Sequence, residues 1–205
     1  MPQSFSSTQV AELICTRISH DLIGNIGAVS NAVELLDDDP ESIEDVKPIL
    51  EISSKVLSDR LKFFRLAFGL NNATLKNVEE LSKIAQNYVQ TLGNRNFPIN
   101  LDIKINNVQI YKIVLLGIMS LTDVFIKGGK LCVTENSEGL DFIASSDFSL
   151  SKPKLQNLQN VLQGILPDEN PAQYAQTVYL QSMLHNLGIT VKASFSEFEA
   201  KLQIA

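Results

Sequence analysis

Apolar residues recur at steps of three and four between residues 10 and 36, which is the period of one buried helix face. This stripe consists of Cys15, Ile18, Leu22, Ile26, Val29, Val33 and Leu36. Acidic residues then break the pattern, with Asp39 as the expected N-cap of a second helix and Pro40 at its first position. A second stripe follows, in which Pro48 is expected to kink the helix or delay its start. The pattern predicts a long helical hairpin over residues 1–70.

The predicted hairpin leaves apolar surface uncovered. Each helix of about 28 residues would span about 40 Å, and no third layer within the segment covers the apolar faces. Pairing with a second copy to form a four-helix bundle is the simplest way to cover them. We therefore expect a homodimer.

The rest of the chain, residues 75–205, mixes helical periods with strand alternation, and residues 71–74 are the expected linker before it. We expect helices over residues 77–92, 108–126, 154–166 and 172–187, and strands over residues 97–105, 130–135, 140–145, 189–195 and 198–204. Neighbouring strands separated by short turns predict hairpins. Helices combined with antiparallel strands favour a two-layer α/β domain, so the fold class of the whole chain is α+β.

Composition narrows the class of protein. A chain of 205 residues that is 44% hydrophobic can bury a full core. A net charge of −6, without any run of Lys or Arg, argues against a nucleic-acid partner. The sequence has no signal-peptide pattern and no stretch approaching eighteen apolar residues, so we expect no membrane association and a cytoplasmic protein. Cys15 and Cys132 stand alone in apolar patterns, which predicts two buried thiols in a reducing compartment.

His20 lies roughly 200° around the predicted helix from its apolar neighbours, so its imidazole is expected at the surface. Four residues share its face at helical spacing: Arg17, Gly24, Gly27 and Asn31. An interior glycine costs about 0.5–1 kcal/mol relative to alanine, so two of them beside an exposed histidine indicate a bare surface that another molecule approaches. The alternative is that these glycines mark close packing between helices.

Other catalytic patterns are absent from the sequence. The two histidines and two cysteines have no metal-ligand spacing, and neither a Gly-x-Ser-x-Gly elbow nor a Walker-type phosphate loop occurs. His185 is expected at a helix C-terminus, where an imidazolium favours the helix dipole and a structural role is the simpler interpretation. Candidate chemistry therefore concentrates at His20, with no metal or cofactor bound by this chain.

The sequence around His20 resembles a known family. Residues 17–22, RISHDL, and residues 27–36, GAVSNAVELL, are similar to the dimerisation helix of ChpT-type histidine phosphotransferases. They are more distantly similar to the His-box of sensor histidine kinases, where an acidic residue follows the phosphorylated histidine. A helical hairpin followed by an α/β domain is also the layout of that family. The resemblance implies that residues 75–205 form a degenerate version of the kinase ATP-binding domain.

The resemblance implies a phosphorelay. His20 would accept a phosphoryl group from an aspartyl phosphate on one receiver domain and pass it to an aspartate on another. The expected partners are the receiver domain of a hybrid histidine kinase and the receiver domains of response regulators. Mg²⁺ would come with the receiver and not with this chain.

The chemistry of the neighbouring residues fits such a relay. An imidazole nitrogen is nucleophilic near neutral pH. Asp21 is expected to accept a hydrogen bond from Nδ1–H of His20, which leaves Nε2 free to attack. Arg17 is expected to bond the phosphoryl oxygens. Antiparallel folding of the hairpin about residue 39 or 40 places His20 level with Asp59 and Arg60, so Arg60 would add positive potential there.

The sequence departs from the pattern of ATP-dependent kinases. Residues 115–123 lack the asparagines that hold magnesium and nucleotide in those enzymes, and residues 147–151 lack the glycines of an Asp-x-Gly-x-Gly loop. We therefore do not expect autokinase activity. Two alternatives remain: a diverged ATP-dependent sensor histidine kinase, and a non-catalytic dimeric adaptor for response regulators.

Overall fold

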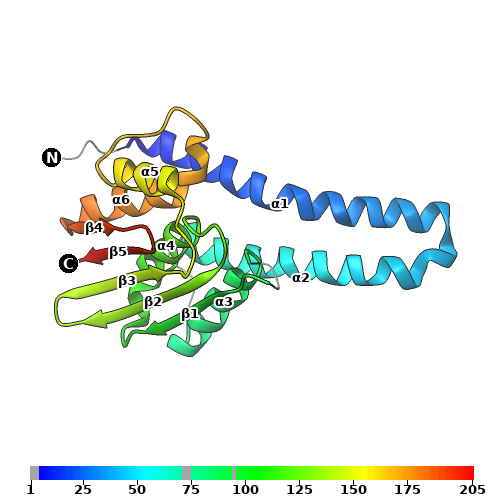
Figure 1. Cartoon of the computed structure of the whole chain (residues 1–205). Coiled ribbons are helices and arrows are strands. Elements are labelled where there is room, and N and C mark those ends of the chain that lie inside the picture. The colour runs from blue at the N-terminus through cyan, green and yellow to red at the C-terminus, as the bar shows by residue number, and fades with distance from the viewer. Residues whose placement is uncertain (1–4, 71–74, 94–95) are drawn as a thin grey trace.

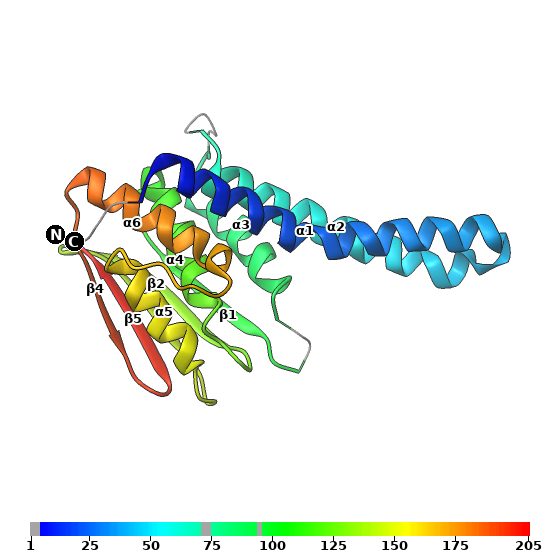
Figure 2. The same cartoon turned by 90° about the horizontal axis from the view of Figure 1, so that it is seen from above.

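The computed structural model describes residues 5–70, 75–93 and 96–205, so the expected linker at residues 71–74 lies outside the described residues. The chain begins with a long helical hairpin that projects to one side of the molecule (Figure 1). The hairpin consists of α1 (Ser7–Asp38), the short 3₁₀ helix η1 (Pro40–Ser42) and α2 (Ile43–Phe68). Its two helices run side by side in Figure 1, and seen from above α1 lies over α2 (Figure 2).

The turn of the hairpin forms as the acidic residues predict. The Asp39 carboxylate accepts a hydrogen bond from the backbone N–H of Glu41 at 3.1 Å, and Pro40 is the first residue of η1. Pro48 lies inside α2, which runs from Ile43. The expected delay of the second helix by Pro48 is therefore wrong. Pro48 is the sixth residue of α2, so the helix forms although the hydrogen bond that a residue at this position would donate to the carbonyl of Glu44 is missing.

The rest of the chain forms a mixed sheet with helices on one of its faces. Its helices are α3 (Val78–Gln90), η2 (Val108–Ile110), α4 (Tyr111–Thr122), α5 (Lys152–Leu162), η3 (Pro171–Tyr174) and α6 (Ala175–Leu187). Its strands are β1 (Ile99–Lys104), β2 (Gly129–Asn136), β3 (Gly139–Ser145), β4 (Val191–Phe195) and β5 (Glu199–Ile204), in the spatial order β1-β2-β3-β5-β4. The predicted α+β class is confirmed.

One pairing differs from the expected antiparallel arrangement. β1 pairs with β2 in parallel, from Ile99 opposite Gly129 to Lys104 opposite Thr134, whereas the other three pairs are antiparallel. The reason is the connection between them, because η2 and α4 carry the chain back to the starting end before β2 begins. A crossover helix between two neighbouring strands makes them parallel.

The sheet buries the face against which the helices pack. Phe142 on β3 lies opposite Val133 and Leu202 in the register, and all three side chains are fully buried. α4 comes so close that a Cβ atom built on Gly117 would lie 2.4 Å from the Phe142 ring. The glycine therefore permits the helix to sit directly on the middle of the sheet.

The base of the hairpin shares this core. Leu22 of α1 and the buried Phe63 and Phe64 of α2 belong to the same hydrophobic cluster as Leu116 of α4 and Phe142. A second, smaller cluster joins the start of α1 to α5 and α6; its buried members are Val10, Leu13, Val161, Tyr174, Ala175 and Val178. The α/β part thus packs against the base of the hairpin, and His20 lies at the end of this packed region.

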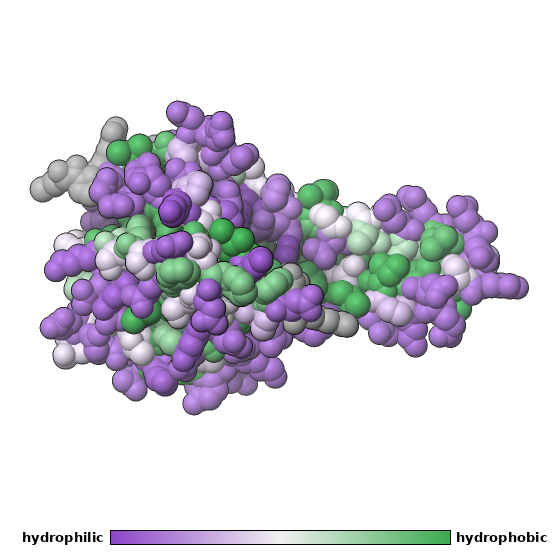
Figure 3. Space-filling view, in the orientation of Figure 1, coloured by the Kyte–Doolittle hydropathy of each residue, from purple (hydrophilic) through white to green (hydrophobic). Residues whose placement is uncertain are grey.

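The outer part of the hairpin keeps much of its apolar surface exposed. Ile26 and Val33 belong to the stripe predicted to be packed, yet they are 50% and 46% exposed in the single chain. Figure 3 shows apolar patches along this part of the hairpin. The reason is that each helix has one partner there, and the α/β part does not reach it. The expected four-helix bundle would need a second chain.

The prediction of two buried thiols is wrong, because Cys15 is exposed and Cys132 is half-buried. The buried face at the start of α1 is set by Val10, Leu13 and Arg17, which turns Cys15 outward. No helix in the described part of the chain is both long enough and apolar enough to cross a membrane.

Candidate functional site

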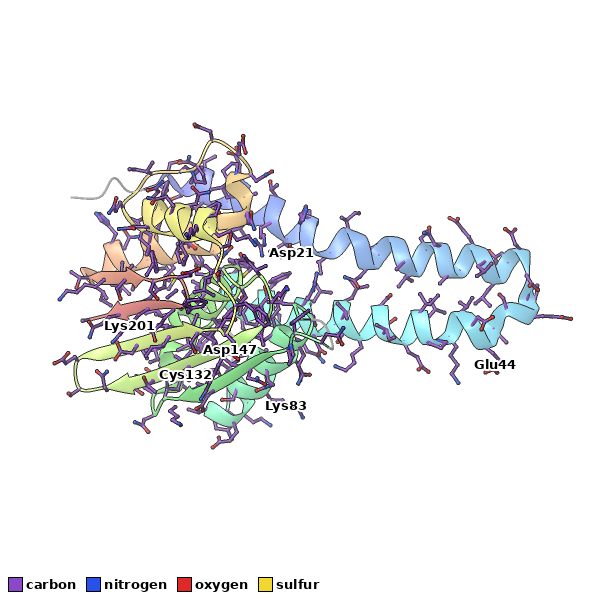
Figure 4. All side chains as sticks on the ribbon, viewed as in Figure 1. Asp21, Glu44, Lys83, Cys132, Asp147 and Lys201 are labelled. Atoms are coloured by element: carbon purple, nitrogen blue, oxygen red, sulfur yellow. The ribbon has the colours of Figure 1, made fainter. Side chains whose placement is uncertain are left out.

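His20 lies on α1 where the hairpin emerges from the α/β part, next to Asp21, which is labelled in Figure 4. Its side chain is 83% exposed, as the position off the apolar stripe predicts. Nδ1 of the imidazole lies 3.3 Å from Oδ1 of Asp21. Because a carboxylate oxygen accepts, this contact needs the ring proton on Nδ1, and Nε2 is then the basic, nucleophilic nitrogen. The expected contact between these two side chains is present.

The second carboxylate oxygen of Asp21 has a different partner. Arg17, one turn earlier on α1, donates from Nε to Oδ2 of Asp21 at 2.8 Å. Its Nη1 and Nη2 donate to the two carboxylate oxygens of Asp123, at 3.1 and 3.2 Å. Nη1 also donates to the backbone carbonyl of Gln173 at 2.7 Å. The guanidinium is therefore buried between α1, the end of α4 and η3.

This environment changes the acid–base chemistry of Arg17. Burial alone would lower the pKa of the guanidinium, but the charges of Asp123 and then Asp21 outweigh it and raise the pKa. Arg17 is thus a permanent cation within the network. We expected its guanidinium beside the exposed imidazole, free to bind phosphoryl oxygens. The structure instead places it in buried ion pairs, because the face of α1 that carries Val10 and Leu13 packs against η3 and α6.

Arg60 lies level with His20 across the hairpin, as the folding of the hairpin predicts. It donates from Nη1 to the backbone carbonyl of Asp21, and from Nε to Oγ1 of Thr91 at 3.1 Å. Arg60 therefore joins α1 to the end of α3. A second predicted neighbour, Asp59, points elsewhere and pairs with Lys55 at 2.6 Å.

The surface beyond His20 is open. A Cβ atom built on Gly24 or Gly27 would meet no other atom within 4 Å, and Asn31 further along is exposed. Close packing within the chain therefore does not account for these two glycines. On the other side of His20, a cavity of about 420 Å³ separates α1 from the segment that precedes α6. Its lining includes Thr16, Arg17, His20, Asp21, Asn170, Ala172 and Gln173.

Asp123 and Gln176 are parts of the network that sequence reasoning missed. Gln176, on α6, donates from Nε2 to Oδ2 of Asp123 at 2.9 Å. A signal for Asp123 was present, since an acidic residue directly after a buried helix is unfavourable for the helix dipole and indicates a cationic partner elsewhere. Nothing in the sequence identifies Arg17, 106 residues away, as that partner.

In the described part of the chain, neither clustered side chains nor the cavity beside Asp123 supports a metal or cofactor site. Among residues 5–70, 75–93 and 96–205, no three His, Cys, Asp or Glu side chains gather in a way that could hold a metal ion. A cavity beside Asp123, lined in part by Gly93, Phe125 and Lys154, holds about 230 Å³. Ligand pockets usually hold roughly 300–1,000 Å³, and we assign no cofactor to this one.

Comparison with known proteins relates the chain to phosphotransferases. No protein-family model matches the sequence. A curated relative, the protein phosphotransferase ChpT of Brucella abortus (strain 2308), is 38% identical over 69 residues. That match spans 34% of this chain and only 32% of the relative's length.

A solved bacterial phosphotransferase, determined at 1.7 Å, superposes with a TM-score of 0.77 at 20% identity and covers 100% of both chains. At this identity the likeness shows a common fold. The chain is therefore similar to the protein phosphotransferase ChpT over a third of its sequence, and it shares the fold of a bacterial phosphotransferase along its whole length.

Proposed function

We propose that this protein is a histidine phosphotransferase of a two-component phosphorelay, in which His20 carries a phosphoryl group between receiver-domain aspartates. The observation that carries the proposal is the 83% exposed imidazole with its Nδ1 held 3.3 Å from Asp21. The open glycine surface beside it supports the approach of a partner. The partial sequence likeness to a curated phosphotransferase and the shared fold with another add support.

The transfer would run through two displacements at phosphorus. Nε2 of His20 attacks an aspartyl phosphate; the N–P bond forms while the P–O bond to the donor aspartate breaks, and that carboxylate leaves with the electron pair. The ring keeps its proton on Nδ1, where the Asp21 carboxylate stabilises the positive charge. A carboxylate of the acceptor then attacks phosphorus, the N–P bond breaks, and its electron pair returns to Nε2. No nucleotide or water is consumed.

The donor would be the receiver domain of a hybrid histidine kinase, and the acceptors would be receiver domains of response regulators. Their Mg²⁺ would neutralise the phosphoryl oxygens. Because Arg17 is engaged in buried ion pairs, its part in this proposal is to hold Asp21. Arg60 holds the backbone of α1 at the same level.

Homodimerisation is part of the proposal. Apolar side chains stay exposed on both helices of the hairpin, and they include Ile23, Ile26, Val33, Leu35, Ile49, Ile52 and Leu61. A patch of this kind on one hairpin is well suited to a second copy, which would form a four-helix bundle with two His20 side chains on its surface.

The test is transfer from receiver domains that have been phosphorylated with labelled acetyl phosphate. We would mix the purified protein with each receiver domain encoded in the same genome, without ATP. The expected product is label on this protein that is acid-labile and base-stable, as a phosphoramidate is.

Two histidine variants form a matched pair, since the sequence has two histidines. His20→Gln should abolish the label, whereas His185→Gln, at the exposed end of α6, should keep it. Label retained by His20→Gln would contradict the proposal, and so would labelling of the wild type by ATP alone. Relay to a second receiver that survives His20→Gln would favour the adaptor alternative.

A further inference from the structure

Asp123 is connected to the reactive histidine through two other side chains. From Asp123 at the end of α4, the contacts run to Arg17, from Arg17 to Asp21, and from Asp21 to Nδ1 of His20. We propose that Asp123 is a positioning residue, which sets the orientation and tautomer of His20 through Arg17 and Asp21. The inference deepens the proposed function and rests on it for its consequence for the transfer rate.

The geometry of Arg17 explains how a distant carboxylate can act on the imidazole. An arginine side chain is long and flexible, but its guanidinium is planar and its N–H directions are fixed relative to one another. Asp123 binds both terminal nitrogens, at 3.1 and 3.2 Å, and so defines the plane of the group. The remaining Nε–H then points along α1 to Oδ2 of Asp21.

Asp21 transmits this constraint because its two oxygens have separate partners. With Oδ2 held 2.8 Å from Arg17 Nε, the carboxylate presents Oδ1 to Nδ1 of His20 at 3.3 Å. Adjacent residues on a helix point in different directions, so this contact needs one particular rotamer of Asp21. A carboxylate that was free to rotate would hold it for only part of the time.

Asp123 is well placed to serve as the fixed point. Its side chain is 16% exposed, and Gln176 on α6 donates to Oδ2 at 2.9 Å. The backbone carbonyl of Gln173 receives a further hydrogen bond from Arg17 at 2.7 Å. The α/β part thereby supports His20 through Arg17 and Asp21, which gives this part a role in phosphoryl transfer.

The test compares two carboxylates of equal exposure. Asp123→Asn removes the charge that binds Arg17, whereas Asp141→Asn removes the charge of a carboxylate on β3, also 16% exposed, that pairs with Lys201. The tautomer of His20 is read from ¹⁵N–¹H correlations of the imidazole nitrogens, with His185 as an internal reference. We expect the Nδ1–H form in the wild type and in Asp141→Asn. In Asp123→Asn we expect a shift toward the Nε2–H form that an isolated histidine prefers.

The rate of transfer supplies the second readout. The coupling energies typical of one ion-pair network correspond to factors of about 2 to 150, so Asp123→Asn should slow phosphorylation of His20 within this range. In a background that already carries Asp21→Asn, the same substitution should have almost no further effect. Additive losses, or an unchanged tautomer in Asp123→Asn, would show that Asp123 only holds α1 to the α/β part, and would overturn the inference.

Two provisions keep the test decisive. If Asp123→Asn does not fold, Gln176→Leu takes its place, because it removes one hydrogen bond to Asp123 while preserving bulk, and the tautomer should shift in the same direction. An unchanged tautomer there would equally contradict the inference. The tautomer is measured without any partner. A wild-type protein that accepts no phosphoryl group would therefore refute the proposed function and leave the positioning role still decided by the spectra.

Discussion

At the scale of single residues, His20 has a neighbour fixed by hydrogen bonds and, next to it, a helix surface without side chains. Asp21 is fixed by Arg17, and its backbone is fixed by Arg60. Further along α1, Gly24 and Gly27 offer no side chain at all. A reactive group that must meet a partner's aspartate benefits from both features. The fixed neighbour lowers the entropy cost of aligning the imidazole, and the bare surface lets the partner's backbone come close.

Gly24 and Gly27 should be costly for stability and useful for transfer. Because a Cβ at Gly27 would meet nothing, Gly27→Ala should raise the free energy of unfolding by about 0.5–1 kcal/mol, measured by urea denaturation. The same substitution should raise the KM for a phosphorylated receiver. Ser30→Ala, about 80° around the helix from His20, is the control that should leave KM unchanged. A Gly27→Ala protein with the wild-type KM would count against a partner surface here.

At the scale of elements, the sequence predicted those features that depend on local periodicity. The hairpin, every strand and the helix next to each strand lie where the patterns place them, with ends shifted by a few residues. The parallel pairing of β1 with β2 was not predicted, because it depends on how a buried helix carries the chain back across the sheet. The contacts of the candidate site likewise fall into those that the sequence predicts and those that it does not. Its contacts along α1 follow from helical spacing, whereas the contact with Asp123 depends on tertiary packing.

The packing of α4 on the sheet gives a prediction opposite in sign to that for Gly27. Gly117→Ala should also gain helix propensity, but its Cβ would lie 2.4 Å from the ring of Phe142, which is fully buried. Overpacking of this kind costs about 1–3 kcal/mol. We therefore expect a lower urea midpoint for Gly117→Ala, with Gly27→Ala as the matched control. A stabilised Gly117→Ala protein would contradict the close packing of α4 on β3.

At the scale of the whole molecule, apolar side chains are buried in a common core around the sheet but stay exposed on the outer hairpin. Around the sheet, core residues of α2, α4 and the strands form one cluster. Along the outer hairpin, two helices face each other with apolar side chains left at the surface (Figure 3). This difference could not be read from the apolar stripes alone, because a stripe has the same period whether its partner is in the same chain or in another.

The proposed dimer predicts a mass twice that of the chain. Light scattering at micromolar concentration should give this value for the wild type. Ile52→Glu, at a position 60% exposed on α2, should lower it toward that of a single chain, because the substitution places a charge in the proposed interface. Ile126→Glu, at a position 62% exposed outside the hairpin, should leave it unchanged. A wild-type mass equal to one chain would refute the dimer.

The exposure of His20 has a consequence for kinetics. With 83% of its side chain open, the nucleophile needs no lid to lift and no internal rearrangement before it can be reached. Phosphorylation should then be governed by diffusional encounter, so the observed rate should rise in proportion to the concentration of receiver until the complex saturates. Timing in such a relay is set by the abundance and affinity of its partners. The direction of phosphoryl transfer through the protein would then be set by which of its receiver domains is phosphorylated.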